Sequence, residues 1–177
     1  MKIQVIGASG SGKSTLGRAL SRRLGVALLE SDRYLWADDD FRIKRPDDEN
    51  VAMLIADLRA HDSFVLTGAP QSWAVGCLPA LDLLVFLRLP HAVRMERLLR
   101  REHARYGVRA LPGGDHHEDT QSFLAWAATY ESSDDKVGNS LASHRILISR
   151  ATCPVLELDA EGSVEDLVEA VLRSLPT

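Results

Sequence analysis

The feature that most constrains this chain is a run of nine residues near its N-terminus, from Gly7 to Thr15, which reads Gly-Ala-Ser-Gly-Ser-Gly-Lys-Ser-Thr. It fits the pattern G-x-x-x-x-G-K-[ST], and it stands between a short apolar segment and a helical pattern, which is the context that this pattern requires. Glycines let the backbone turn tightly and bring N–H groups close to phosphate oxygens, while the positive end of the following helix attracts anions. The run therefore predicts a loop that binds nucleotide phosphates.

Each residue type in the run suits one part of a triphosphate. The Lys13 ammonium can reach the β- and γ-phosphates, and the Ser14 hydroxyl can ligate Mg²⁺, which prefers oxygen ligands. Thr15 is placed near the α-phosphate. We predict that ATP is bound together with Mg²⁺ and that the residues of the cradle are Gly7, Ser9, Gly10, Ser11, Gly12, Lys13, Ser14 and Thr15.

Strand and helix patterns alternate along the rest of the chain. Short apolar runs predict five strands, at 2–6, 26–29, 63–67, 83–87 and 155–158. Apolar residues at helical spacing predict helices at 14–24, 47–59, 91–106 and 163–174. Ser163 is the expected N-cap of the last helix, with Asp166 three residues on. This alternation predicts an α/β fold with a parallel sheet covered on both faces.

Composition excludes several classes of protein. The net charge of −4 argues against direct nucleic-acid binding, because such proteins need a basic excess. Cys77 and Cys153 match no zinc spacing and no disulfide framework. The start is too short for a signal peptide h-region, and no run is apolar enough to span a membrane. We therefore expect a cytoplasmic protein.

The predicted helix 91–106 is rich in arginine, and seven of the seventeen arginines lie between Arg88 and Arg109. At 100° per residue, one narrow face carries four of them. Such a face repels itself unless anions lie among its side chains, and the alternative is a solvated face balanced by nearby acidic residues. The arginines of this face are Arg94, Arg97, Arg101 and Arg105. The residues expected to bury against the sheet are Ala92, Met95 and Leu99.

Together, these motifs resemble the adenylate-kinase-like branch of P-loop kinases. The chain also looks like bacterial proteins related to adenylate kinase that carry the label DNA topology modulation protein. The shared features are the P-loop, the segments 32–36 and 82–90, the run from Arg97 to Arg101 that matches Arg-Leu-x-x-Arg, and the run Phe123-x-x-Trp126-x-x-x-Tyr130.

The resemblance implies a three-layer P-loop fold with strand order 2-3-1-4-5. It implies a single domain, 1–177, with an acceptor-binding insertion at about 31–60 and a lid at about 105–122 that includes Gly107, Gly113 and Gly114. It places Arg97 on the adenine and Arg101 on the transferring phosphates. The loop 159–163, with Gly162, would cup the adenine through its backbone.

The chain departs from adenylate kinases after the third strand. Thr67-Gly68-Ala69-Pro70-Gln71 stands where they carry Asp-Gly-Phe-Pro-Arg, which weakens the case for AMP as acceptor. Glu30-Ser31-Asp32 instead resembles the Asp-x-Asp of shikimate-kinase-like enzymes. By that resemblance Glu30 approaches the metal shell and Asp32 binds an acceptor hydroxyl. The alternative is that Asp32 is the N-cap of a helix at 33–36.

The sequence thus predicts a small-molecule kinase that moves the γ-phosphoryl group of ATP to a hydroxyl or a nucleoside monophosphate. Its catalytic residues would be Lys13, Asp32, Arg97 and Arg101. The rival hypothesis is a non-catalytic or weakly hydrolytic nucleotide-binding regulator. The run 115–118 holds two histidines, and a polar lid is preferred there over a metal site because adjacent side chains point different ways.

Overall fold

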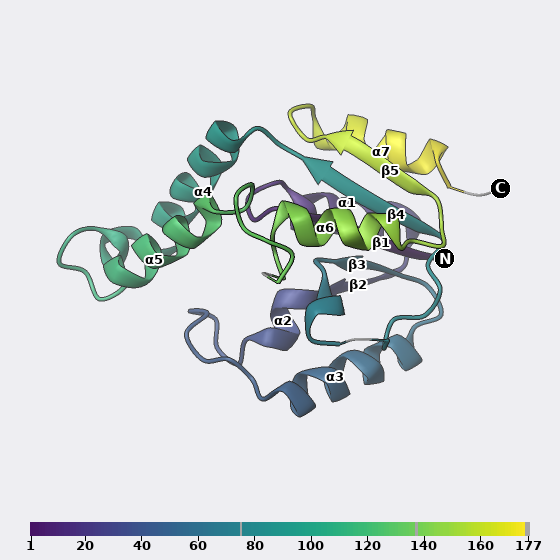
Figure 1. Cartoon of the computed structure of the whole chain (residues 1–177), viewed down its shortest axis with the longest axis horizontal. Helices are drawn as coiled ribbons and strands as arrows, with labels where there is room; N and C mark the ends of the chain where they lie inside the picture. Colours follow the sequence, from purple (N-terminus) through teal and green to yellow (C-terminus); the bar gives the residue numbers. More distant parts are fainter. Residues whose placement is uncertain (75, 137, 176–177) are drawn as a thin grey trace.

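A five-stranded parallel sheet forms the centre of the molecule (Figure 1). The computed structural model describes residues 1–74, 76–136 and 138–175. The strands are β1 Lys2–Gly7, β2 Ala27–Glu30, β3 Phe64–Thr67, β4 Leu83–Arg88 and β5 Val155–Asp159. Their order, β2-β3-β1-β4-β5, confirms the predicted fold class.

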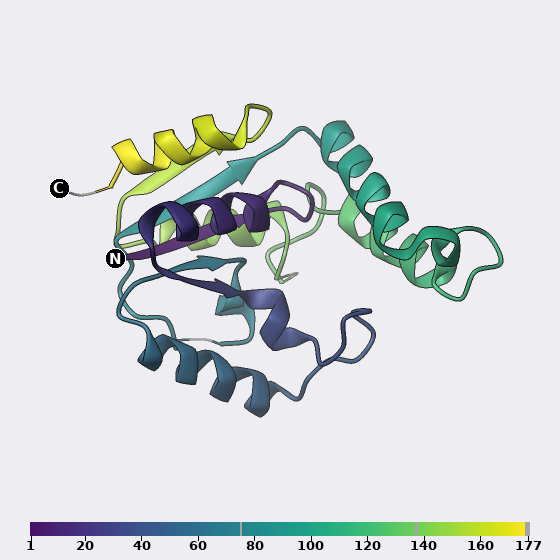
Figure 2. The ribbon, with the colours of Figure 1, turned by 180° about the vertical axis from the view of Figure 1, so that it is seen from behind.

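Helices cover both faces of this sheet. The helices of the chain are α1 Lys13–Leu24, α2 Ser31–Leu35, α3 Asp47–Ala60, α4 His91–Tyr106, α5 His117–Ala128, α6 Leu141–Ser149 and α7 Val164–Arg173, with the 3₁₀ helices η1 Pro70–Ser72 and η2 Gly107–Ala110. Figure 1 shows α6 in front of the sheet, and Figure 2 shows α1 in front of the opposite face. No helix in the described parts of the chain is long and apolar enough to cross a membrane.

The strands read as near-continuous apolar runs because both sheet faces are buried. In β1, Ile3 and Val5 pack in the core cluster that includes residues of α1 and α7, whereas Ile6 packs toward α6. Gln4 is the polar exception, and it is fully buried on the side facing away from α1. Its amide exchanges hydrogen bonds of 2.8 and 3.1 Å with the amide of Gln71.

Local signals in the sequence account for the helix boundaries. Gly25 ends α1 in the left-handed conformation, with φ of 67°. The expected cap of α7 is confirmed, since the Ser163 hydroxyl accepts a hydrogen bond from the backbone N–H of Asp166 at 3.1 Å. Sequence reasoning missed α5 and α6. The second is opened by a capping box of Ser140 and Ser143, a pair that lacks the Glu or Gln of the usual pattern.

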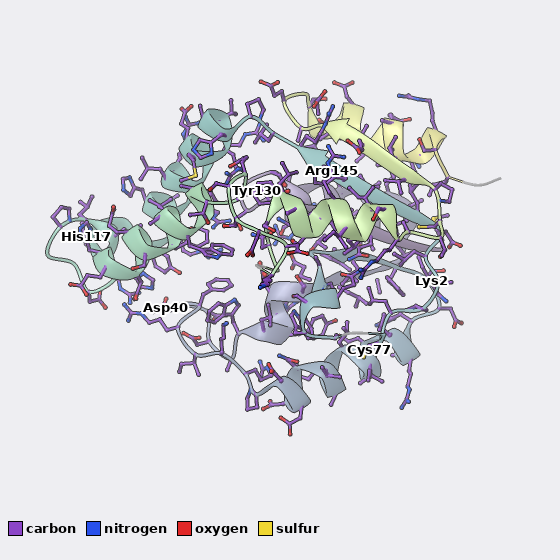
Figure 3. All side chains as sticks on the ribbon, viewed as in Figure 1. Lys2, Asp40, Cys77, His117, Tyr130 and Arg145 are labelled. Carbon is purple, nitrogen blue, oxygen red and sulfur yellow. The ribbon has the colours of Figure 1, made fainter. Side chains whose placement is uncertain are left out.

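The helix pair α4 and α5 projects from one end of the sheet as a hairpin. Figure 3 shows His117 at the outer end of this hairpin and Tyr130 at its inner end, near the sheet. Part of the expected lid, 107–116, forms η2 and the turn at the outer end.

Candidate nucleotide and acceptor site

The loop between β1 and α1 is held by close packing around its glycines. Gly7 has φ of 146°, and a Cβ on it would lie 2.5 Å from the carbonyl oxygen of Leu87 in β4. Gly10 has φ of 83°, and a Cβ there would lie 2.8 Å from the Leu98 side chain in α4. Since real Cβ atoms do not tolerate such contacts, side chains at these positions are excluded by backbone conformation and by space.

The first turn of α1 completes an anion-binding cradle. Gly12 occupies the N-cap position with φ of 99° and offers no side chain to cap the helix. The first N–H groups of a helix lack partners within it, so they remain available to a phosphate. Ser14 and Thr15 lie in this turn, and Ser11 is fully buried beneath the loop. All eight residues predicted for the cradle therefore lie in one loop and one helical turn.

The Lys13 side chain lies within this loop. Its Nζ donates to the carbonyl oxygen of Ala8 at 2.7 Å. Burial lowers the pKa of Lys13 to about 8, the Asp32 carboxylate opposes this change, and the positive charges of Arg101 and Arg94 add to it. An ammonium so placed gains electrostatic stabilisation when triphosphate oxygens replace its backbone partner.

Asp32 lies in the first turn of α2, just beyond the carboxyl end of β2. The N-cap of that helix is Glu30, without a side-chain capping bond, so the alternative that Asp32 caps the helix is wrong. The Asp32 side chain is exposed, and its charge acts on Lys13. The structure thus places this carboxylate close enough to the phosphate loop for its charge to raise the pKa of Lys13.

The residues predicted to hold Mg²⁺ are Ser14 and Glu30. The Glu30 carboxylate is 16% exposed and pairs with Arg18 at 2.8 Å. Among the residues that the structure describes, no group of three His, Cys, Asp or Glu side chains could hold an ion. This donor set fits an ion that arrives with the triphosphate and keeps several waters, as Mg²⁺ does. Ser14 would contact it, and Glu30 would act through water.

Arg97, predicted to lie on the adenine, contacts the loop after β5. The Arg97 guanidinium donates to the carbonyl oxygen of Ala160 at 3.2 Å. Gly162 follows two residues later, and a Cβ on it would meet no atom within 4 Å. An exposed guanidinium fixed beside an open backbone turn can stack on a planar ring.

Arg101 lies one helical turn beyond Arg97 on α4. Its guanidinium is 2.8 Å from the carboxylate of Glu102 and 5.3 Å from the centre of the Phe123 ring. The side chain is 44% exposed, and its charge lowers the pKa of Lys13. Arg101 therefore lies where it can supply positive charge to the same phosphates as Lys13.

The predicted orientation of α4 is wrong on both of its predicted faces. Arg94, expected among the anion-facing arginines, is completely buried, and it donates to both carboxylate oxygens of Glu131 at 3.0 and 3.1 Å. Leu99 is 42% exposed, and Leu98 is buried instead. Ala92 is also exposed, and Met95 is only partly buried. The reason is that α4 packs mainly on α5 and η2 rather than flat on the sheet.

Several residues around the loop were not assigned to the site from the sequence: Tyr130 belongs to the run that begins at Phe123, whereas His144 and Asn139 belong to no short motif. The Tyr130 hydroxyl lies 2.8 Å from Nδ1 of His144 in α6, and the Arg94 guanidinium lies 5.3 Å from the centre of the Tyr130 ring. Burial, with a smaller contribution from Lys13, lowers the pKa of His144 to about 4. Asn139 donates to the Ser9 hydroxyl at 3.2 Å. These contacts join positions far apart in sequence, which local patterns do not reveal.

The loop 38–42 touches the α4–α5 hairpin, and we call this contact the clasp. Arg42 pairs with Asp119 at 2.6 Å, and Arg109 pairs with Asp40 at 3.0 Å. The Arg105 guanidinium lies 4.7 Å from the centre of the Phe41 ring. Figure 3 shows Asp40 beside the hairpin. The clasp joins the predicted acceptor insertion to the predicted lid.

His116, just before α5, and His117, its first residue, make different contacts. His116 is buried and stacks on the Tyr106 ring, with ring centres 3.7 Å apart. His117 instead lies 3.0 Å from the carbonyl oxygen of Ala110 through its Nδ1.

A glycine-rich loop between the first strand and a helix, in a sheet of this order, defines a P-loop nucleotide-binding protein. The sequence family described as AAA domain matches residues 3–121, and the chain belongs to that family. It is 40% identical to the uncharacterized protein YqaC of Bacillus subtilis (strain 168), over 98% of this chain and 96% of that protein.

Two further similarities concern kinases. The chain is 29% identical to Shikimate kinase 2 of Sodalis glossinidius (strain morsitans), over 97% of this chain and 93% of the relative. The crystal structure of a gluconokinase from Sinorhizobium meliloti 1021 superposes with a TM-score of 0.54 at 20% identity, over 97% of this chain and 89% of that one. The structural similarity supports the fold.

Proposed function

We propose that this protein transfers the γ-phosphoryl group of ATP to a hydroxyl group of a small molecule. The observation that carries the proposal is the exposed carboxylate of Asp32, which interacts electrostatically with Lys13 at the phosphate loop. A carboxylate in this position can orient an acceptor hydroxyl toward the γ-phosphate and accept its proton. The similarity to Shikimate kinase 2 supports the same class of reaction.

The other site residues take roles that follow from their positions. Lys13 and Arg101 stabilise the charge that develops on the transferring phosphoryl group, because fixed positive charges act there without reorganisation. Arg97 and the turn at Gly162 hold the base. Mg²⁺, which Ser14 would hold with Glu30 in its outer shell, would supply further positive charge. Residues 31–60 receive the acceptor, and residues 105–122 close as a lid.

The contacts around the insertion favour a hydroxyl over a nucleoside monophosphate. The Gln71 side chain is held by Gln4 and is turned to the sheet rather than to an acceptor. Arg45 donates to the carbonyl oxygens of Tyr34 and Trp36. Arg42 belongs to the clasp. Binding an acceptor phosphate would require several of these donors to be released from their present partners.

An ADP-release assay across hydroxy acids, sugars, nucleosides and nucleoside monophosphates tests the proposal. With the best acceptor, Asp32→Asn should reduce transfer at least ~100-fold because it removes the proton-accepting charge, while ATP affinity changes less than ~2-fold. Asp39→Asn makes the same substitution at an exposed position of the insertion and should leave transfer unchanged.

Three results would count against the proposal. Full turnover by Asp32→Asn removes the acceptor role of that residue. A nucleoside monophosphate as the best acceptor removes the hydroxyl preference. Tight ATP binding without acceptor-dependent ADP release would instead support a nucleotide-binding regulator, the role implied by the resemblance to DNA topology modulation proteins.

A further inference from the structure

The connection between α5 and α6 reaches the phosphate loop. Asn139 Nδ2 donates to the hydroxyl of Ser9 at 3.2 Å. The preceding Gly138 packs so closely on Ser72 that a Cβ on the glycine would lie 2.8 Å from the serine Cβ. Asn139 is therefore placed between the phosphate loop and the chain that follows β3, although no nucleotide-binding motif includes it.

Both ends of this connection are fixed. At one end, Glu131 is bound by the buried guanidinium of Arg94. At the other end, Ser140 is fully buried, caps α6 through Ser143, and donates to the carbonyl oxygen of Asp134 at 2.7 Å. Because Asn139 immediately precedes this cap, its backbone position is set by the start of the helix.

The contact between Asn139 and Ser9 lies at the end of the cradle that is expected to receive the β- and γ-phosphates. Lys13 reaches those phosphates in loops of this type, and here its Nζ donates to Ala8, the residue before Ser9. A side-chain amide has two N–H donors. Asn139 uses one on Ser9, and no described residue accepts the other.

We propose that Asn139 binds the γ-phosphate of the nucleotide and so makes the site prefer a triphosphate over a diphosphate. The second N–H of the amide donates a charge-assisted bond to a phosphate oxygen, which is stronger than the neutral bond that the first N–H makes with Ser9. The inference rests on the proposed nucleotide site, but it does not require an acceptor.

Calorimetric titration with Mg²⁺ and either a non-hydrolysable ATP analogue or ADP tests this role. Asn139→Ala should weaken the triphosphate analogue about 10-fold and change ADP affinity less than ~2-fold, since one hydrogen bond to a charged group is lost. Asn139→Asp should weaken the analogue further, because its carboxylate repels the γ-phosphate while still accepting a bond from Ser9. Ser132→Ala, in the same connection but bonded to Thr129, should change neither affinity.

A purely structural contact gives a different pattern. In that case Asn139→Asp binds both nucleotides like the wild type, or Asn139→Ala weakens both equally, and either result overturns the proposal. Thermal melting of each variant establishes that the folded protein is being titrated. If the wild type binds neither nucleotide, the proposed function fails as well. If it binds both without transferring phosphate, the titration still decides the role of Asn139.

Discussion

The phosphate loop and the clasp adjoin the same functional region, yet they are built in opposite ways. In the loop, the space that a Cβ would need at Gly7 and Gly10 is already filled by backbone and by Leu98. In the clasp, the joining groups are charged side chains such as Arg42 and Asp119, which are 36% and 50% exposed. Buried packing therefore fixes the phosphate loop, whereas solvent weakens the ion pairs of the clasp.

This difference separates the two parts of the proposed site. Exposed ion pairs contribute about 0–1 kcal/mol each and are screened by salt. The clasp can therefore open without a large loss of stability, while the phosphate loop keeps its shape. We expect the phosphate loop to be intolerant of substitution and the clasp to be permissive.

The largest effect is expected on the nucleotide side, at Arg101. Arg101→Ala should lower kcat at least ~100-fold, as when a fixed charge contact in the transition state is lost. Arg100→Ala serves as the control, because Arg100 is exposed and pairs with Glu96 on α4. Steady-state kinetics on both variants checks the expectation. Equal kinetics for the two would place Arg101 outside the reaction and weaken the contrast between the regions.

A smaller effect follows from the pKa of Lys13, which burial lowers to about 8 in the ligand-free protein. The ammonium is charged below that pH and loses its charge as the pH rises, and only the charged form attracts phosphate. ATP affinity should therefore be full at pH 7 and about tenfold weaker at pH 9. Adenosine, which has no phosphate, should bind equally at both values. Calorimetric titration measures this, and a flat ATP profile would contradict it.

The smallest effect is expected at the clasp. Arg42→Ala, Asp119→Ala and the double variant should show a coupling of about 0.5 kcal/mol in unfolding free energy, which disappears in 1 M salt. Each variant should change turnover less than ~2-fold. Denaturant unfolding and the ADP-release assay provide the measurements. A salt-resistant coupling above about 2 kcal/mol would show that the clasp is as firmly built as the phosphate loop.

The sequence was a good guide where local chemistry determines the structure. The pattern from Gly7 to Thr15 predicted its loop because backbone conformation and helix geometry require those residue types. The continuous apolar strands predicted the sheet, and Asp32 was placed correctly beyond β2. The orientation of α4 was not predictable in this way, because the burial of Arg94 depends on Glu131, which is 37 residues away. The role of Asn139 was not predictable either, because its contact with Ser9 joins residues that are 130 positions apart in the sequence.

The contact between Gly10 and Leu98 also sets a rule for exchanging parts among related proteins. Leu98 approaches the position that a side chain on Gly10 would occupy, so the residue at one position limits which residue the other position can hold. A chimera that receives α4 from a relative would tolerate a residue no larger than leucine at position 98, because a bulkier one would push the loop out of shape. Grafting the loop and α4 together should preserve nucleotide binding in cases where grafting either one alone does not.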